Sequence, residues 1–166
     1  MAVSMRVLVV ANRTADSEGL VEALLRHAAT ADVEYFLLVP ATRRGPDRQA
    51  GFEAAQAQLN AALDRVRESG LDAEGAVGDP DPIVAVNDIW RPGLFDEVIV
   101  STLSRETSEW VAYDLPHRIA RLTDCQVIHV VPAEVERELA RARFRRPLRA
   151  APQRSLGPFV GPSDQA

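Results

Sequence analysis

A group of hydroxyl side chains around one arginine is the most suggestive chemical feature of the sequence. Five hydroxyl residues flank Arg105 in one short segment: Ser101, Thr102, Ser104, Thr107 and Ser108. A guanidinium is permanently charged and presents several N–H donors in one plane, so together with neighbouring hydroxyls it can bind an anion. A solvated polar loop explains the same residues without a ligand. Both interpretations stay open on the sequence alone.

A second polar segment follows the first apolar stretch, at Asn12 and Thr14. In open parallel sheets, ligands bind beyond the carboxyl ends of the strands, at the point where strand order reverses. Loops 12–17 and 101–114 are therefore expected to lie together. The residues expected to line such a pocket are Asn12, Thr14, Ser101, Thr102, Ser104, Arg105 and Ser108.

Asp114 and His117 could form an acid–base pair, since both titrate and lie three residues apart. The same residues fit a helix start, with Asp114 as the N-cap and Pro116 in the first turn. Asp81 followed by Pro82 also fits a cap. We therefore expect no catalytic residue here, although the acid–base alternative remains.

Several kinds of site find little support in the sequence. His27, His117 and His129 lie far apart, which does not suggest a metal site. We interpret His27 as a residue on a helix face and His129 as a core or interface residue. All 19 basic residues are arginine, so Schiff-base and P-loop lysine chemistry are excluded. Trp110 and Tyr113 could stack on a ligand ring or anchor the loop, and anchoring is the more common role.

Composition is that of a globular domain, with 46% hydrophobic and 26% charged residues in 166. Cys125 is the single cysteine, and no apolar stretch reaches the length of a membrane span, so we expect a cytoplasmic protein without a signal peptide. The net charge is −5, yet seven basic residues fall between Arg137 and Arg154. Nucleic-acid binding is not expected, because the body is acidic and no aromatic residues alternate with these arginines.

Apolar stretches alternate with helical patterns up to about residue 132. Strands are expected at 5–11, 33–39, 71–77 (at a sheet edge), 95–101 and 126–131. Helices are expected from Asp16 or Ser17, over 48–69 with Phe52 on its apolar stripe, after Asp81, and around Leu115, Ile119 and Leu122. This alternation predicts an α/β fold: a three-layer sandwich around a five-stranded, parallel, doubly wound sheet.

The chain divides into one α/β domain at 1–132 and a shorter C-terminal part. Val135, Leu139 and Ala142 share one face, which predicts a helix at 133–146. Four prolines and two glycines predict a flexible tail at 147–166.

Four short segments carry a resemblance to a known family. They are Asn-Arg-Thr at 12–14, Val-Gly-Asp-Pro at 77–80, Phe-Asp-Glu-Val-Ile-Val at 95–100 and Cys-Gln-Val-Ile-His-Val at 125–130. Over about residues 6–132 the sequence resembles the universal stress protein family, which implies that family's fold, related to the adenine nucleotide alpha hydrolases. The resemblance also implies a homodimer in which the last strand pairs across subunits.

ATP-binding members of that family carry glycines after the fourth strand, where backbone amides contact phosphates. The matching positions here are Ser101, Ser104 and, within one residue, Asp114, and the family's first-strand acid is matched by Asn12. Side chains there would obstruct close approach of the backbone. We therefore expect no cofactor, with ATP or another adenine nucleotide as the doubtful alternative.

The sequence favours a non-catalytic or weakly catalytic stress-protein-like module that binds a small anion, a nucleotide-like ligand or a partner protein. One alternative is an enzyme that uses Arg105 and His117 on a phosphorylated or adenylated substrate. Another is a scaffold that acts through the arginine-rich tail.

Overall fold

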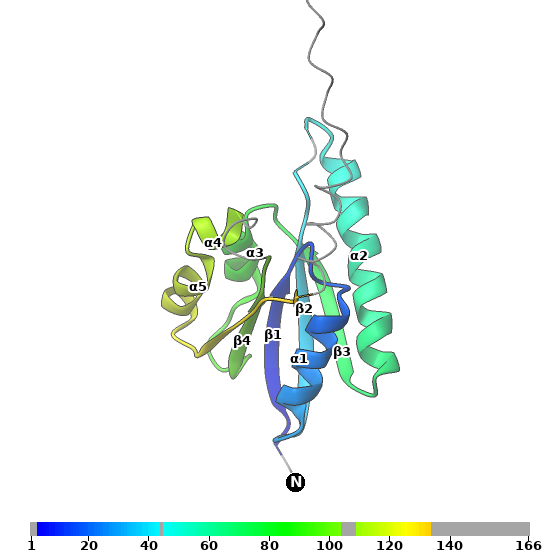
Figure 1. Ribbon diagram of the computed structural model, residues 1–166. Helices are drawn as coiled ribbons and strands as arrows, with labels where there is room; N and C mark the ends of the chain where they lie inside the picture. Colours follow the sequence, from blue (N-terminus) through cyan, green and yellow to red (C-terminus); the bar gives the residue numbers. More distant parts are fainter. Residues whose placement is uncertain (1–2, 44, 104–108, 134–166) are drawn as a thin grey trace, which may run out of the picture.

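A computed structural model describes residues 3–43, 45–103 and 109–133, and Figure 1 shows their arrangement. Five strands form one sheet: β1 (Met5–Ala11), β2 (Val33–Pro40), β3 (Asp72–Gly78), β4 (Glu97–Ser101) and β5 (Val127–Val130). All pairings are parallel, in the order β3-β2-β1-β4-β5. Strand order reverses between β1 and β4, as a doubly wound fold requires.

Five helices connect the strands: α1 (Glu18–Ala28), α2 (Arg48–Glu68), α3 (Pro82–Ile89), α4 (Glu109–Ala112) and α5 (Leu115–Thr123). α1 and α2 cover one face of the sheet, and α3 and α5 cover the other (Figure 1). The predicted three-layer α/β fold is confirmed. Only the four-residue helix α4 had no counterpart in the predicted pattern.

Alternate residues of the central strands serve the two hydrophobic cores. Val7 and Val9 of β1 point into the core under α1 and α2, whereas Leu8 and Val10 point into the core under α3 and α5. All four side chains are fully buried. A strand buried on both faces needs a continuous apolar run, and this explains why β1 could be recognised from its sequence.

Helix starts are fixed by side-chain caps. Ser17 accepts a hydrogen bond from the Leu20 amide, Asp47 from the Ala50 amide, and Asp81 from the Ile83 amide, with Pro82 in the first helical turn. Each cap satisfies an amide that the helix itself leaves unpaired. The predicted caps at Ser17 and Asp81 are confirmed.

The predicted apolar stripe of α2 was wrong at Phe52, whose side chain is 45% exposed. Its neighbour Gly51 is buried instead and packs against the β2–α2 loop. The Thr42 amide donates to the Gly51 carbonyl, 3.3 Å away. Close contact between helix and loop needs a residue without a side chain, so glycine takes the inward position.

Asp114 occupies the predicted N-cap position of α5, but its side chain does not cap the helix. Asp114 has a left-handed backbone (φ 55°) and makes no capping hydrogen bond. Its carboxylate instead contacts His117 Nδ1 at 2.5 Å. An N-cap residue normally has extended backbone, and a left-handed one directs its side chain away from the free amides.

The sheet has two edges, β3 and β5. At β3, the Arg67 guanidinium donates from Nε and Nη2 to the Ala73 carbonyl oxygen, at 3.0 and 2.8 Å. β5 pairs with β4 on one side. Among the residues that the structure describes, no helix combines the length and hydrophobicity needed to span a bilayer. The predicted C-terminal helix and tail fall almost wholly outside the described residues, beyond Ala133.

Candidate functional site

An open cleft of about 1170 Å³ lies beyond the carboxyl ends of the strands. The loops after β1, β2 and β4 line it, together with residues of α2, α4 and α5. It contains the point where strand order reverses, between β1 and β4. The fold therefore places a cleft where ligands bind in other open parallel sheets.

The floor of the cleft contains a pair of buried hydroxyls. Thr14 Oγ1 and Ser101 Oγ lie 2.7 Å apart, and each residue is only 1% exposed. Ser17 Oγ donates to the Thr14 carbonyl at 2.7 Å and fixes that loop. Two hydroxyls carry two hydrogens and share one in their mutual bond, so the pair has a second hydrogen that this bond does not use.

Thr102 also lines the cleft but is engaged within the protein. Its Oγ1 donates to the Leu103 carbonyl at 2.7 Å and accepts from His129 Nε2 at 2.7 Å. Its single hydroxyl hydrogen is thereby used. The His129 ring lies partly buried against Thr102, and this burial lowers the pKa of His129. Thr102 therefore links the cleft to β5 and offers no free hydrogen to a ligand.

Three arginines, Arg13, Arg43 and Arg118, line the cleft from three different segments. All three are exposed, and none of their guanidinium groups makes a hydrogen bond or ion pair with another described residue. The cleft holds two carboxylates, Asp16 beside Gln58 (3.4 Å) and Asp81, which caps α3. Unpaired guanidinium groups bind carboxylate and phosphate groups well. The cleft is thus locally cationic in a chain of net charge −5.

These arginines were missed in the sequence analysis. Arg13 stands between the two predicted residues Asn12 and Thr14, and Arg43 follows β2 in a segment treated only as a turn. Arg118 comes one residue after His117. The available signal was an arginine directly after a buried strand, next to the expected point of strand reversal.

Of the predicted ligand-binding residues, Asn12, Thr14, Ser101 and Thr102 lie together around the cleft. Ser104, Arg105 and Ser108 lie outside the described residues, so their predicted role is untested.

The cleft walls differ in character. Ala54, Ala57 and Ala61 of α2 form a wall of small apolar side chains. Trp110 and Tyr113 lie at the α4 side, and Tyr113 is 69% exposed. A ligand with an apolar or aromatic part as well as an anionic group fits these surfaces.

Asp114 and His117 are paired as the acid–base interpretation required, yet neither belongs to the residues lining the cleft. Both side chains are well exposed, at 62% and 80%. The pair is therefore not directed at a ligand in the cleft. Within the described part of the chain, no group of three potential ligands could hold a metal ion.

Comparisons with known proteins agree on the fold. No family model and no curated protein matches the sequence. Among solved structures, a universal stress protein from Archaeoglobus fulgidus is 14% identical, with a TM-score of 0.56, covering 76% of this chain and 93% of that one. A universal stress protein in complex with cAMP is 19% identical, with a TM-score of 0.55 and coverages of 80% and 99%. The Archaeoglobus fulgidus protein in complex with dAMP is 12% identical, with a TM-score of 0.52 and coverages of 78% and 98%.

Proposed function

We propose that this chain, which has the universal stress protein fold, is a binding module for a small anionic or nucleotide-like ligand. The observation that carries the proposal is the set of three unpaired arginines, Arg13, Arg43 and Arg118, around one cleft. The buried hydroxyl pair of Thr14 and Ser101 adds a donor at its floor. Two structures with this fold hold cyclic or deoxy adenosine monophosphate, which supports a ligand of this size and charge.

A triphosphate bound by backbone amides fits this chain poorly. At Ser101 the family's glycine is replaced by a buried side chain that is bonded to Thr14. Asp114, near the position of the family's second glycine motif, carries a side chain and does not line the cleft. We infer that arginine side chains bind the anion here, and that ATP in the family's usual pose does not bind.

The test is isothermal titration of the purified protein with AMP, cAMP and ATP. Replacing Arg13, Arg43 or Arg118 by glutamine should each weaken binding of AMP or cAMP about 10- to 100-fold, because a charge-assisted hydrogen bond is worth about 1.5–3 kcal/mol. Arg65→Gln, an exposed position on α2 away from the cleft lining, is the matched control. Equal affinity in the triple variant and the wild type would reject the proposal, as would ATP binding more tightly than the monophosphates.

The residues of the cleft favour a protein that binds a ligand over an enzyme that converts one. Among the described residues, the cleft hydroxyl that contacts an imidazole, Thr102 beside His129 Nε2 at 2.7 Å, already donates its hydrogen to the Leu103 carbonyl, so His129 does not activate it as a nucleophile. The Asp114–His117 pair lies outside the lining. The alternative enzyme would use Arg105, which lies outside the described ranges, together with His117, which is described but does not line the cleft. The scaffold would use the arginine-rich tail, which also lies outside the described ranges. Loss of partner binding on deletion of 147–166, with ligand binding intact, would favour the scaffold.

We further propose a cytoplasmic homodimer that pairs through β5. Within the described part of the chain, β5 pairs on one side only, whereas at the other sheet edge the Arg67 guanidinium occupies the Ala73 carbonyl of β3. An edge strand with free backbone groups is suited to pairing with a second copy. Val127→Pro or Val130→Pro should reduce the mass measured by light scattering to that of a monomer. An unchanged mass in a folded variant would contradict this.

A further inference from the structure

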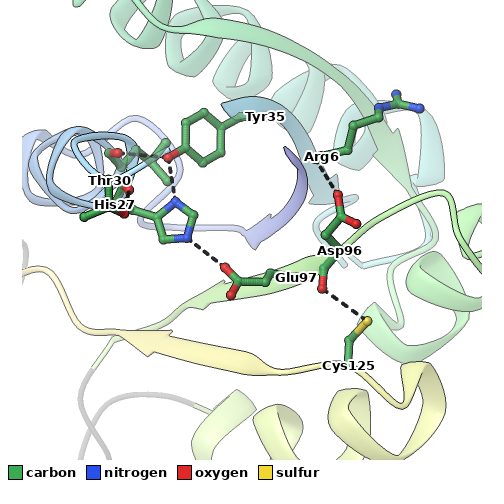
Figure 2. Close-up of polar contacts among 8 residues, drawn as sticks. Arg6, His27, Thr30, Tyr35, Asp96, Glu97 and Cys125 are labelled. Atoms are coloured by element: carbon green, nitrogen blue, oxygen red, sulfur yellow. Dashed lines mark hydrogen bonds and ion pairs between the residues drawn. The ribbon is translucent and has the colours of Figure 1, made fainter. Parts of the chain in front are cut away.

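His27, in the last turn of α1, connects two strands at the amino end of the sheet, opposite the cleft. Its Nδ1 lies 2.9 Å from the Tyr35 hydroxyl on β2, and its Nε2 lies 2.8 Å from Glu97 Oε2 on β4 (Figure 2). Val7 of β1 pairs with both Tyr35 and Glu97, so the three residues form one row across the sheet. The imidazole therefore bridges β2 and β4 over β1.

The number of hydrogens in this network can be counted. The Tyr35 hydroxyl donates its one hydrogen to the Leu24 carbonyl at 2.9 Å, so it accepts from His27 Nδ1. A neutral imidazole with hydrogen on Nδ1 has a lone pair on Nε2. That lone pair would face the Glu97 oxygen, another acceptor, at 2.8 Å. With the Tyr35 hydrogen placed on the Leu24 carbonyl, the contact is attractive only when one additional proton lies between Nε2 and Oε2.

Few other charges bear on this proton. Tyr35 faces His27 from β2 and Glu97 faces it from β4, while β1 contributes the apolar Val7. On α1 itself, Arg26 is paired with Glu22 at 3.9 Å.

The groups beyond Glu97 do not contact His27. The Asp96 carboxylate accepts from the Arg6 amide, and the Cys125 thiol donates to the Asp96 carbonyl (Figure 2). Burial, followed by the charge of Glu97, raises the pKa of Tyr35, so the phenol keeps its hydrogen.

We propose that His27, Tyr35 and Glu97 form a one-proton lock that holds the C-terminal end of α1 on the sheet. When the proton leaves for solvent, Tyr35 must turn its hydrogen from the Leu24 carbonyl to Nδ1, and the remaining imidazole hydrogen moves to Nε2 to donate to Glu97. The protein then has one hydrogen bond fewer. Raising the pH should therefore loosen the last turn of α1.

The lock is distinct from the proposed anion site. The two are connected through α1, because Ser17 caps its other end and holds the Thr14 carbonyl at the cleft floor. Failure of anion binding would leave the lock unaffected, and the experiments below do not use a ligand.

The first test is nitrogen-15 NMR of the full chain with labelled histidine at pH 7. In the wild type, both His27 ring nitrogens should carry hydrogen. Glu97→Gln is the matched variant. The glutamine amide can donate a hydrogen bond to Nε2, so the contact no longer needs the additional proton, and His27 should carry hydrogen on Nδ1 alone. Hydrogen on Nε2 alone in the wild type would overturn the proposal, because Tyr35 would then be the donor to His27.

The second test needs no variant. Amide hydrogen exchange, corrected for intrinsic rates, is compared at pH 6 and pH 9 in the wild type. The Ala29 amide is hydrogen-bonded to the Leu25 carbonyl, and its protection factor should be about fivefold lower at pH 9 than at pH 6. A fivefold change corresponds to the loss of about one hydrogen bond. The Ser69 amide, bonded to the Arg65 carbonyl at the end of α2, is the internal reference and should not change. An equal change at both amides, or none at Ala29, would contradict the lock.

Discussion

Gly51→Ala should destabilise the protein, although alanine is the better helix former. Helix propensity alone predicts a gain of about 1 kcal/mol for this change. A Cβ at position 51 would lie 2.0 Å from the Thr42 carbonyl oxygen and 3.2 Å from its carbon. Both contacts are with backbone, which cannot rotate away as a side chain can. The β2–α2 loop would have to move off the helix.

The expected size follows from three contributions. Displacing a packed neighbour costs about 1–3 kcal/mol, and the hydrogen bond from the Thr42 amide to the Gly51 carbonyl contributes about 1 kcal/mol more. The gain in helix propensity offsets about 1 kcal/mol. The free energy of unfolding should therefore fall by about 1–3 kcal/mol.

Urea denaturation followed by circular dichroism measures this difference. Asp64→Ala, at an exposed position of α2, is the control and should leave stability unchanged or slightly higher. A Gly51→Ala protein as stable as the wild type would refute the reasoning, since the contact with Thr42 would then not constrain the loop. Arg43 follows Thr42 directly, so the variant should also bind AMP more weakly.

Three further predictions concern single side chains. His129 has a lowered pKa, so its protonation favours the unfolded chain: stability is full above about pH 6.5 and falls as the pH drops. Thermal unfolding of His129→Gln between pH 7.5 and 5.5 should show a smaller loss than the wild type, and parallel curves would argue against it. Asp124 ends α5 with φ 51°, so Asp124→Gly should raise the free energy of unfolding by about 1 kcal/mol, and a lower melting temperature would contradict this. Burial, followed by the charges of Asp124, Asp96 and Glu97, raises the pKa of Cys125. Its thiol should therefore react with iodoacetamide at pH 8 more slowly than the thiol of glutathione does. Faster labelling of Cys125 than of glutathione would contradict this prediction.

The fold was predictable because its signals are local. The apolar run at 5–11 predicted the first and last residues of β1 correctly. Gly70, with φ 88°, follows α2, where the end of that helix was expected. The caps at Ser17 and Asp81 likewise depend on residues within one turn. The prediction failed where a helix packs closely against the loop that precedes it. Gly51 is buried because Thr42 approaches it, and this displaced Phe52 from the expected stripe.

The candidate site was predictable only in outline. Its location followed from strand order, and Asn12, Thr14, Ser101 and Thr102 do lie there. Sequence could not show that Thr102 is engaged by His129, because β5 lies 27 residues further on. It also could not show that Arg13, Arg43 and Arg118 meet at one cleft, since their segments are adjacent only after the sheet has formed.

The two guanidinium hydrogen bonds from Arg67 to Ala73 limit how large an assembly can become. A sheet that could add neighbours at both margins would extend into fibres of indefinite length. At β3 the carbonyl of Ala73 already has a partner within the chain. If two copies joined along β5, the edges left outward would be β3 edges with this acceptor occupied, which would disfavour addition of further copies.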